Sequence, residues 1–156
     1  MIADATGRPR LRMPSSVLFC CTLNSICSPM AEGMLKLLHG RRIFVDSVGV
    51  RRAPVDPFAV AVAEELGVDL SKHRPKTFDD LEDGSYDLIV SLSPEAQHKA
   101  VELTRDMACD VEYWPTFDPS IAEGSRDQQL DAFREVRDQL MRRIRQRFPP
   151  MGSMAL

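Results

Sequence analysis

Two absences narrow the class of protein to which this sequence can belong. No apolar run approaches the roughly 20 residues of a membrane-spanning helix, and the arginines near the N-terminus precede no hydrophobic segment typical of a signal peptide. Cysteines are few and unevenly spread, without the spacing of a disulfide scaffold or a zinc site: Cys20, Cys21, Cys27 and Cys109. We therefore expect a protein of the reducing cytoplasm, with no membrane contact, no metal and no cofactor.

The sequence also has no large excess of positive or negative charge. The formal net charge is −3 over 156 residues, which favours neither nucleic-acid binding nor adsorption to a membrane surface. Hydrophobic residues make up 44% of the chain, enough for one domain with a sizeable core. We expect a disordered leader over residues 1–14, where prolines interrupt a basic run, a single folded domain over 15–148, and a short tail over 149–156.

From residue 17 onward, short apolar runs alternate with segments of helical periodicity. The expected strands are 17–21, 43–50, 86–92 and 109–114, and the expected helices are 29–39, 57–66, 93–105 and 127–147. Strands that take turns with helices predict an α/β fold, a four-stranded parallel sheet with helices on both faces. Ligands of such sheets bind at the carboxyl ends of the strands.

The stretch 17–32 is the part of the chain that points to chemistry. Its buried strand ends at Cys21, and a polar loop of six residues leads to Ser28 and Pro29, which we interpret as the N-cap and first residue of a helix. Strand alternation points Cys20 into the core and leaves Cys21 free to react. Backbone N–H groups and the positive end of the helix converge beside Cys21, an arrangement that binds oxyanions and favours the nucleophilic thiolate.

These residues resemble the signature of the low-molecular-weight protein tyrosine phosphatases and of the thioredoxin-coupled arsenate reductases that share their fold. That signature is a cysteine, five residues, an arginine and a serine, usually followed by Pro-Met-Ala-Glu. The matching positions in this sequence are Cys21, Asn24, Ser28, Pro29, Met30, Ala31 and Glu32. The resemblance implies the phosphotyrosine phosphatase I-like fold.

The resemblance also implies roles for individual residues. Cys21 would attack a phosphomonoester and form a cysteinyl-phosphate, and Asp118, in an Asp-Pro pair after the fourth strand, would protonate the leaving oxygen. Ser47 would help to hold the loop asparagine. The phosphate-binding loop would be Thr22, Leu23, Asn24, Ser25, Ile26, Cys27 and Ser28. The implied ligands are a phosphorylated protein or a small phosphomonoester, and inorganic phosphate or a similar oxyanion.

One position departs from the signature. Cys27 stands where the family has the arginine that grips phosphate through a planar, charged fork. By analogy with arginine-finger enzymes, losing such a group lowers the rate by roughly 10³ to 10⁵. We therefore expect strongly impaired phosphatase activity. The substitution could be passive, or Cys27 could form a disulfide with Cys21 if their Cα atoms come within about 7 Å.

Two other functions stay open on the sequence alone. The first is a thiol oxidoreductase of the arsenate reductase type, which in this fold passes oxidation from the loop cysteine to cysteines on a helix beyond the third strand. Residues 91–105 contain no cysteine, which weakens this alternative. The second is a non-catalytic module that binds a phosphorylated ligand without turning it over.

Overall fold

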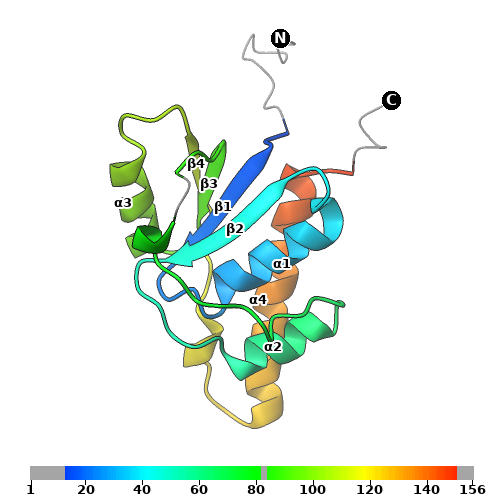
Figure 1. Ribbon diagram of the computed structural model, residues 1–156. Helices are drawn as coiled ribbons and strands as arrows, with labels where there is room; N and C mark the ends of the chain where they lie inside the picture. Colours follow the sequence, from blue (N-terminus) through cyan, green and yellow to red (C-terminus); the bar gives the residue numbers. More distant parts are fainter. Residues whose placement is uncertain (1–12, 82–83, 151–156) are drawn as a thin grey trace, which may run out of the picture.

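The computed structural model describes residues 13–81 and 84–150. Most of the predicted leader and of the predicted tail, residues 1–12 and 151–156, lies outside the described residues. Within that part of the chain, four strands form one parallel sheet in the order β2-β1-β3-β4 (Figure 1). The strands are β1 (Ser16–Cys21), β2 (Phe44–Gly49), β3 (Leu88–Ser91) and β4 (Asp110–Tyr113). The predicted four-stranded parallel α/β fold is confirmed.

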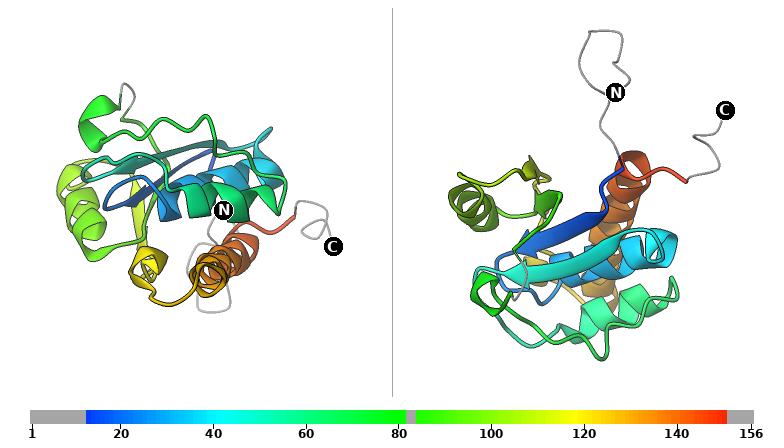
Figure 2. Two further views of the ribbon diagram at one scale, coloured as in Figure 1. Left: turned by 90° about the horizontal axis from the view of Figure 1, so that it is seen from below. Right: turned by 45° about the horizontal axis from the view of Figure 1, so that its top comes forward.

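Four helices cover the sheet, together with two short 3-10 turns. Helices α1 (Cys27–His39), α2 (Pro57–Glu64) and α4 (Arg126–Arg147) gather on one side, and α3 (Pro94–Leu103) lies on the other, as both views of Figure 2 show. The turns are η1 (Phe78–Asp80) and η2 (Pro119–Ile121). Among the described residues, no helix combines the length and apolar character that crossing a membrane requires.

Strand alternation in β1 divides the core into two clusters. Val17, Phe19 and Cys21 pack toward α1 and α4, whereas Leu18 and Cys20 pack in the smaller cluster on the α3 side. All five side chains are at least 93% buried, since Cys21, the most exposed of them, has a relative accessibility of 7%. A central strand that is buried on both faces consists of consecutive apolar residues, and for this reason β1 could be recognised in the sequence.

The start of α1 differs from the prediction. The helix begins at Cys27 and its N-cap position is Ile26, which makes no side-chain cap hydrogen bond. The interpretation of Ser28 as an N-cap was therefore wrong, because its hydroxyl turns toward Cys21 instead. Three of the predicted strands are two or three residues longer than the observed ones, and the first is one residue shorter because β1 already begins at Ser16, as expected where pairing rather than hydrophobicity sets the ends.

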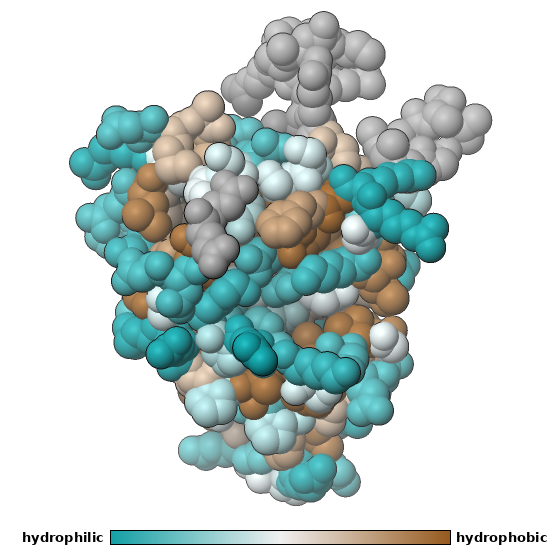
Figure 3. All heavy atoms as spheres, in the orientation of Figure 1, coloured by the Kyte–Doolittle hydropathy of each residue, from teal (hydrophilic) through white to brown (hydrophobic). Residues whose placement is uncertain are grey.

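The outer surface carries no single large apolar face in the view of Figure 3. Hydrophobic atoms there form separate small patches between hydrophilic side chains. Exposed apolar side chains elsewhere include Leu23, Phe117 and Ile121, which belong to the loops that follow β1 and β4. These loops leave the carboxyl edge of the sheet, where the predicted site lies.

Candidate active site

Cys21 is the last residue of β1, and its sulfur receives two polar contacts from the loop that follows. The backbone N–H of Asn24 donates to Cys21 Sγ at 3.3 Å, and Ser28 Oγ lies 2.8 Å from the same sulfur. Ser28 Oγ accepts a hydrogen bond from Asn24 Nδ2 at 2.9 Å, and its own hydrogen has two acceptors within reach, the Cys21 sulfur at 2.8 Å and the more distant Val48 carbonyl oxygen at 3.4 Å. Donors directed at the sulfur suit a thiolate nucleophile.

Asn24 holds the loop in shape. Its φ of 53° is left-handed, a conformation that asparagine tolerates better than most residues. Its amide nitrogen donates to Ser28 Oγ and, at 3.0 Å, to Ser47 Oγ. Its Oδ1 accepts from His73 Nε2 and from the Lys76 backbone N–H, each at 3.0 Å. All four hydrogen-bonding positions of this fully buried amide are therefore used.

A second layer of contacts fixes the partners of Asn24. Ser47 Oγ donates to Glu32 Oε1 at 2.6 Å, and Glu32 forms an ion pair with Lys36 one turn further along α1. The network also reaches His73. Burial has the largest effect on the pKa of His73 and lowers it below the ordinary value, while the negative charge of Glu32 opposes this shift. Sequence reasoning predicted the support from Ser47 but missed His73, because 49 residues separate it from Asn24 and no local pattern links them.

The loop also offers unused backbone donors. Among the described residues, no acceptor is found for the N–H groups of Ser25, Ile26, Cys27 and Ser28. The other side of the loop is pinned to the segment after β2, since the N–H groups of Val50, Arg51, Ala53 and Asp56 donate to the carbonyls of Cys21, Thr22, Leu23 and Ser25. Free amides between a strand end and a helix N-terminus are an arrangement that suits the binding of an oxyanion.

Gly49 permits this close approach of β2 to the loop. A Cβ atom at this position would lie 2.3 Å from the Arg51 carbonyl oxygen and 2.7 Å from the Asn24 nitrogen. Both are backbone atoms, which cannot turn aside as a flexible side chain can. The shape of the loop therefore depends on a residue without a side chain in the neighbouring strand.

Cys27, the departure from the signature, points to the loop that follows β4. Its sulfur lies 4.0 Å from the Phe117 carbonyl oxygen. Burial raises the pKa of this thiol well above the ordinary value, and negative charge on Cys21 and Asp118 adds to the effect. Cys27 is therefore a neutral thiol near neutral pH, and it brings no positive charge to the loop.

Asp118 lies on the loop after β4, at the carboxyl edge of the sheet. The contact of Cys27 Sγ with the Phe117 carbonyl oxygen places this loop beside the start of α1, where the negative charge of Asp118 adds to the raised pKa of Cys27. Asp118 Oδ1 accepts from Ser120 N at 2.9 Å and from Ser120 Oγ at 2.7 Å, which caps η2. The side chain is exposed, so its second oxygen faces solvent.

The other two cysteines take no part in the loop. Cys20 is fully buried, and burial raises its pKa, which makes it a core residue. Cys109 precedes β4 at the amino edge of the sheet. Register pairs Cys20 with Ser91 and Ser91 with Tyr113, which puts Cys109 roughly 16 Å below the level of Cys21 at 3.3 Å per residue. In the described part of the chain, no group of three or more His, Cys, Asp or Glu side chains could hold a metal ion.

Of the basic residues between α2 and η1, Lys76 pairs with Asp46 at 2.6 Å, while Lys72 and Arg74 line a cavity of about 540 Å³ beside α1. This cavity also contains His73, behind Asn24. A different cation lies close to the loop. Arg51 forms a two-pronged ion pair with Glu95, with N–O distances of 2.9 and 3.3 Å.

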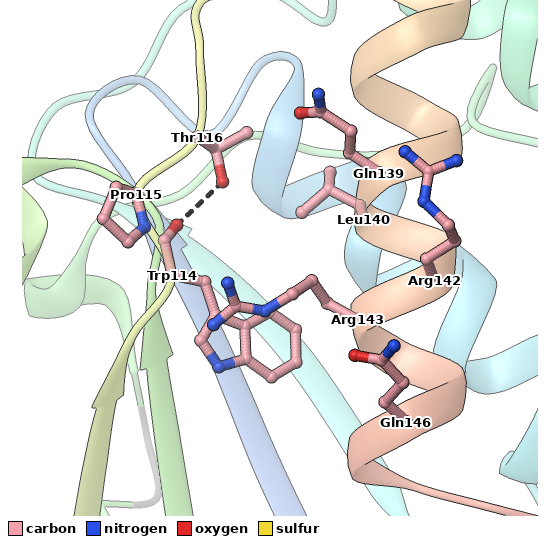
Figure 4. Close-up of a pocket in the computed structure, with 8 residues that line it drawn as sticks. All are labelled: Trp114, Pro115, Thr116, Gln139, Leu140, Arg142, Arg143 and Gln146. Atoms are coloured by element: carbon pink, nitrogen blue, oxygen red, sulfur yellow. Dashed lines mark hydrogen bonds between the residues drawn. The ribbon is translucent and has the colours of Figure 1, made fainter.

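Two further cavities border the segment that carries Asp118. One, of about 280 Å³, is lined by Pro119, Ser120 and residues of α2 and α4. The other, of about 240 Å³, lies between the start of this segment and α4, where Arg143 stacks over the Trp114 ring at 5.1 Å (Figure 4). Trp114 itself is buried.

Comparison with known proteins agrees with the geometry of this loop. The family model for "low molecular weight phosphotyrosine protein phosphatase" matches residues 16–152. The chain belongs to this family. Its sequence is 33% identical over 129 residues to the glutaredoxin arsenate reductase of Synechocystis sp., covering 82% of this chain and 92% of that protein. It is 31% identical over 130 residues to the arsenate reductase of Bacillus subtilis, covering 83% and 92%.

Solved structures of the family superpose on this fold. An arsenate reductase in the phosphate-binding state has a TM-score of 0.65 at 31% identity, covering 85% of this chain and 95% of that one. The tyrosine phosphatase Wzb from Escherichia coli K30, in complex with sulphate, has a TM-score of 0.71 at 23% identity, covering 86% and 96%. Arsenate reductases and tyrosine phosphatases therefore share this fold, and the known members of the family are enzymes.

Proposed function

We propose that this protein is a cysteine-dependent phosphomonoester hydrolase of the low-molecular-weight phosphatase type, with turnover limited by Cys27. The observation that carries the proposal is the sulfur of Cys21, which faces a donated N–H at 3.3 Å and a hydroxyl at 2.8 Å. Free backbone N–H groups of the same loop are available for the non-bridging oxygens of a phosphate. Relatives that bind phosphate or sulphate support this use of the loop.

The first chemical step would be an in-line attack of the Cys21 thiolate on phosphorus. The S–P bond forms as the bond to the leaving oxygen breaks, and Asp118 gives its proton to that oxygen. Asp118 suits this role because one of its oxygens is held by Ser120 while the other is free to carry the proton. The products of this step are the free alcohol or phenol and a cysteinyl-phosphate.

In the second step, water would attack the cysteinyl-phosphate. The ionised Asp118 takes a proton from the water, the P–O bond forms and the thiolate of Cys21 leaves, which regenerates the enzyme and releases inorganic phosphate. Ser28 supports the departure of the thiolate because its hydroxyl can donate to the sulfur as negative charge returns.

Cys27 limits both steps. An arginine would hold two phosphate oxygens as charge spreads over them in the transition state, and the half-buried neutral thiol of Cys27 offers at most one weak donor. We therefore infer slow turnover with retained oxyanion binding. A non-catalytic phospho-ligand module is the limiting case of the same site, in which binding persists and turnover is undetectable.

The second candidate is an arsenate reductase activity, which the relatives at 31–33% identity favour. Cys21 would form a thiol adduct with arsenate. Attack of a second thiol on the Cys21 sulfur would then release arsenite and leave a disulfide that an external dithiol must reduce. Cys109 is too far for this, because a disulfide needs Cα atoms within about 7 Å. Cys20 packs on the opposite face of the sheet from Cys21, which leaves Cys27 of the same loop as the candidate second thiol, and its raised pKa disfavours the thiolate that attacks.

One assay separates these functions. The chain is incubated in reducing buffer with p-nitrophenyl phosphate, and in parallel with arsenate plus a thioredoxin or glutaredoxin system whose NADPH consumption is recorded. Slow phosphate release that Cys21→Ser abolishes supports the hydrolase. NADPH consumption that depends on arsenate and is lost in Cys27→Ser would favour the reductase. Phosphate release that survives Cys21→Ser would contradict the proposed nucleophile.

A further inference from the structure

The loop has an oxyanion site without the arginine that normally neutralises the bound charge, and the fold supplies another cation next to it. We propose that Arg51 is the phosphate-binding cation of this protein and that it exchanges Glu95 for the oxyanion when one binds. This inference rests on the proposed function of the Cys21 loop. It assigns the charge that Cys27 cannot provide to a residue outside the signature.

A closed ring of contacts ties the Arg51 side chain to the α3 side of the Cys21 loop. The Arg51 backbone N–H donates to the Thr22 carbonyl at 2.8 Å, and Thr22 Oγ1 donates to Ser93 Oγ at 3.0 Å. Ser93 caps α3, whose first turn carries Glu95, and Glu95 returns to the Arg51 guanidinium. Thr22 directly follows Cys21, so the ion pair bridges the loop on its α3 side, where the segment after β2 passes it (Figure 1).

The Arg51–Glu95 pair is weak enough to open. The two side chains have relative accessibilities of 57% and 53%, and exposed ion pairs contribute about 0–1 kcal/mol. A bound phosphate group carries about −1.5 to −2 charge at pH 7, against −1 for the carboxylate, and it accepts the same two-pronged contact. The guanidinium therefore has a better partner in an oxyanion than in Glu95.

Three other cations near this part of the fold have carboxylate partners of their own. Lys76 pairs with Asp46, and Lys36 pairs with Glu32 behind the Asn24 network. Arg52, the neighbour of Arg51, faces Asp80 at 3.8 Å. Arg52 resembles Arg51 in charge and exposure but does not join the ring, which makes it a matched control.

The test measures the affinity of inorganic phosphate by isothermal titration calorimetry in reducing buffer, which does not depend on turnover. We expect Arg51→Ala to weaken phosphate binding about 10- to 100-fold, because this is the loss of affinity that removing a hydrogen bond to a charged group produces. Arg52→Ala should change the affinity less than about twofold. Glu95→Gln should tighten binding, because it frees the guanidinium and removes a nearby negative charge.

A double-mutant cycle with Cys27→Arg separates direct binding from a structural role. If Arg51 replaces the missing arginine, Arg51→Ala should weaken phosphate binding strongly in the natural background and much less once Cys27→Arg is present. Equal losses in both backgrounds would overturn the inference, as would an unchanged affinity of Arg51→Ala. If neither the natural chain nor Cys27→Arg binds phosphate, both the proposed function of the loop and the inference about Arg51 fail.

Discussion

Replacing Cys27 with arginine should strongly raise the phosphatase turnover that we propose for this chain. Cys27 is the first residue of α1, beside four backbone N–H groups with no acceptor among the described residues, so an arginine there enters an otherwise complete oxyanion loop. Restoring an arginine that stabilises the transition state is worth roughly 10³ to 10⁵ in rate by analogy with arginine-finger enzymes. At 1.36 kcal/mol per factor of ten, this corresponds to about 4–7 kcal/mol of activation free energy.

The lower end of that range is the better expectation, for two structural reasons. Arg51 already offers a guanidinium on the α3 side of the loop, so part of the stabilisation is present before the substitution. The side chain at position 27 also faces Asp118, which acts electrostatically on it and would compete with phosphate for the new guanidinium. We therefore expect kcat for p-nitrophenyl phosphate to rise about 10³-fold.

The assay compares kcat and KM of the natural chain with three variants at the same position. Cys27→Ala should gain nothing, Cys27→Lys should gain less than Cys27→Arg because it lacks the planar fork, and Cys27→Arg should lose its gain when combined with Cys21→Ser. A folded Cys27→Arg variant that binds phosphate but turns over no faster than the natural chain would refute the reasoning. It would mean that the missing guanidinium does not limit catalysis.

Three further predictions concern the support of the site. Asp118→Asn, made in the arginine-activated variant, should lower kcat about 10²- to 10⁴-fold with phosphotyrosine and less with p-nitrophenyl phosphate, whose leaving group needs less protonation; equal losses on both substrates would argue against a general acid. Gly49→Ala should destabilise the fold by about 1–3 kcal/mol and weaken phosphate binding, because the added methyl group meets backbone atoms at 2.3 and 2.7 Å; an unchanged Tm would contradict this. The pKa of His73 is lowered in the folded state, chiefly through burial. The stabilisation of the fold by neutral His73 is therefore fully present at pH values above the unfolded-state pKa of about 6.5, and it is lost as pH falls through the folded-state pKa. Tm measured between pH 7 and pH 5 should therefore fall less steeply in His73→Gln, whose amide keeps the donor, than in the natural chain or in the control His98→Gln.

The sequence alone determined the fold class and the position of the candidate nucleophile. A buried strand, a short polar loop and a helix start are local patterns, and they fixed Cys21 at the carboxyl end of β1. The candidate acid could be placed at the same edge because parallel strands carry their carboxyl ends together, and Asp118 follows β4. The departure at Cys27 was also visible in the sequence, since the signature has a fixed spacing.

The tertiary structure alone decided how the loop is held and which charges surround it. His73 forms a hydrogen bond with Asn24, 49 residues away in the sequence, and Arg51 forms an ion pair with Glu95, 44 residues away. Neither pair leaves a local signal in the sequence. Their meeting depends on the order β2-β1-β3-β4 and on the route of the segments between the strands. Local patterns record which backbone a segment adopts, whereas the contacts of its side chains exist only once distant segments have packed.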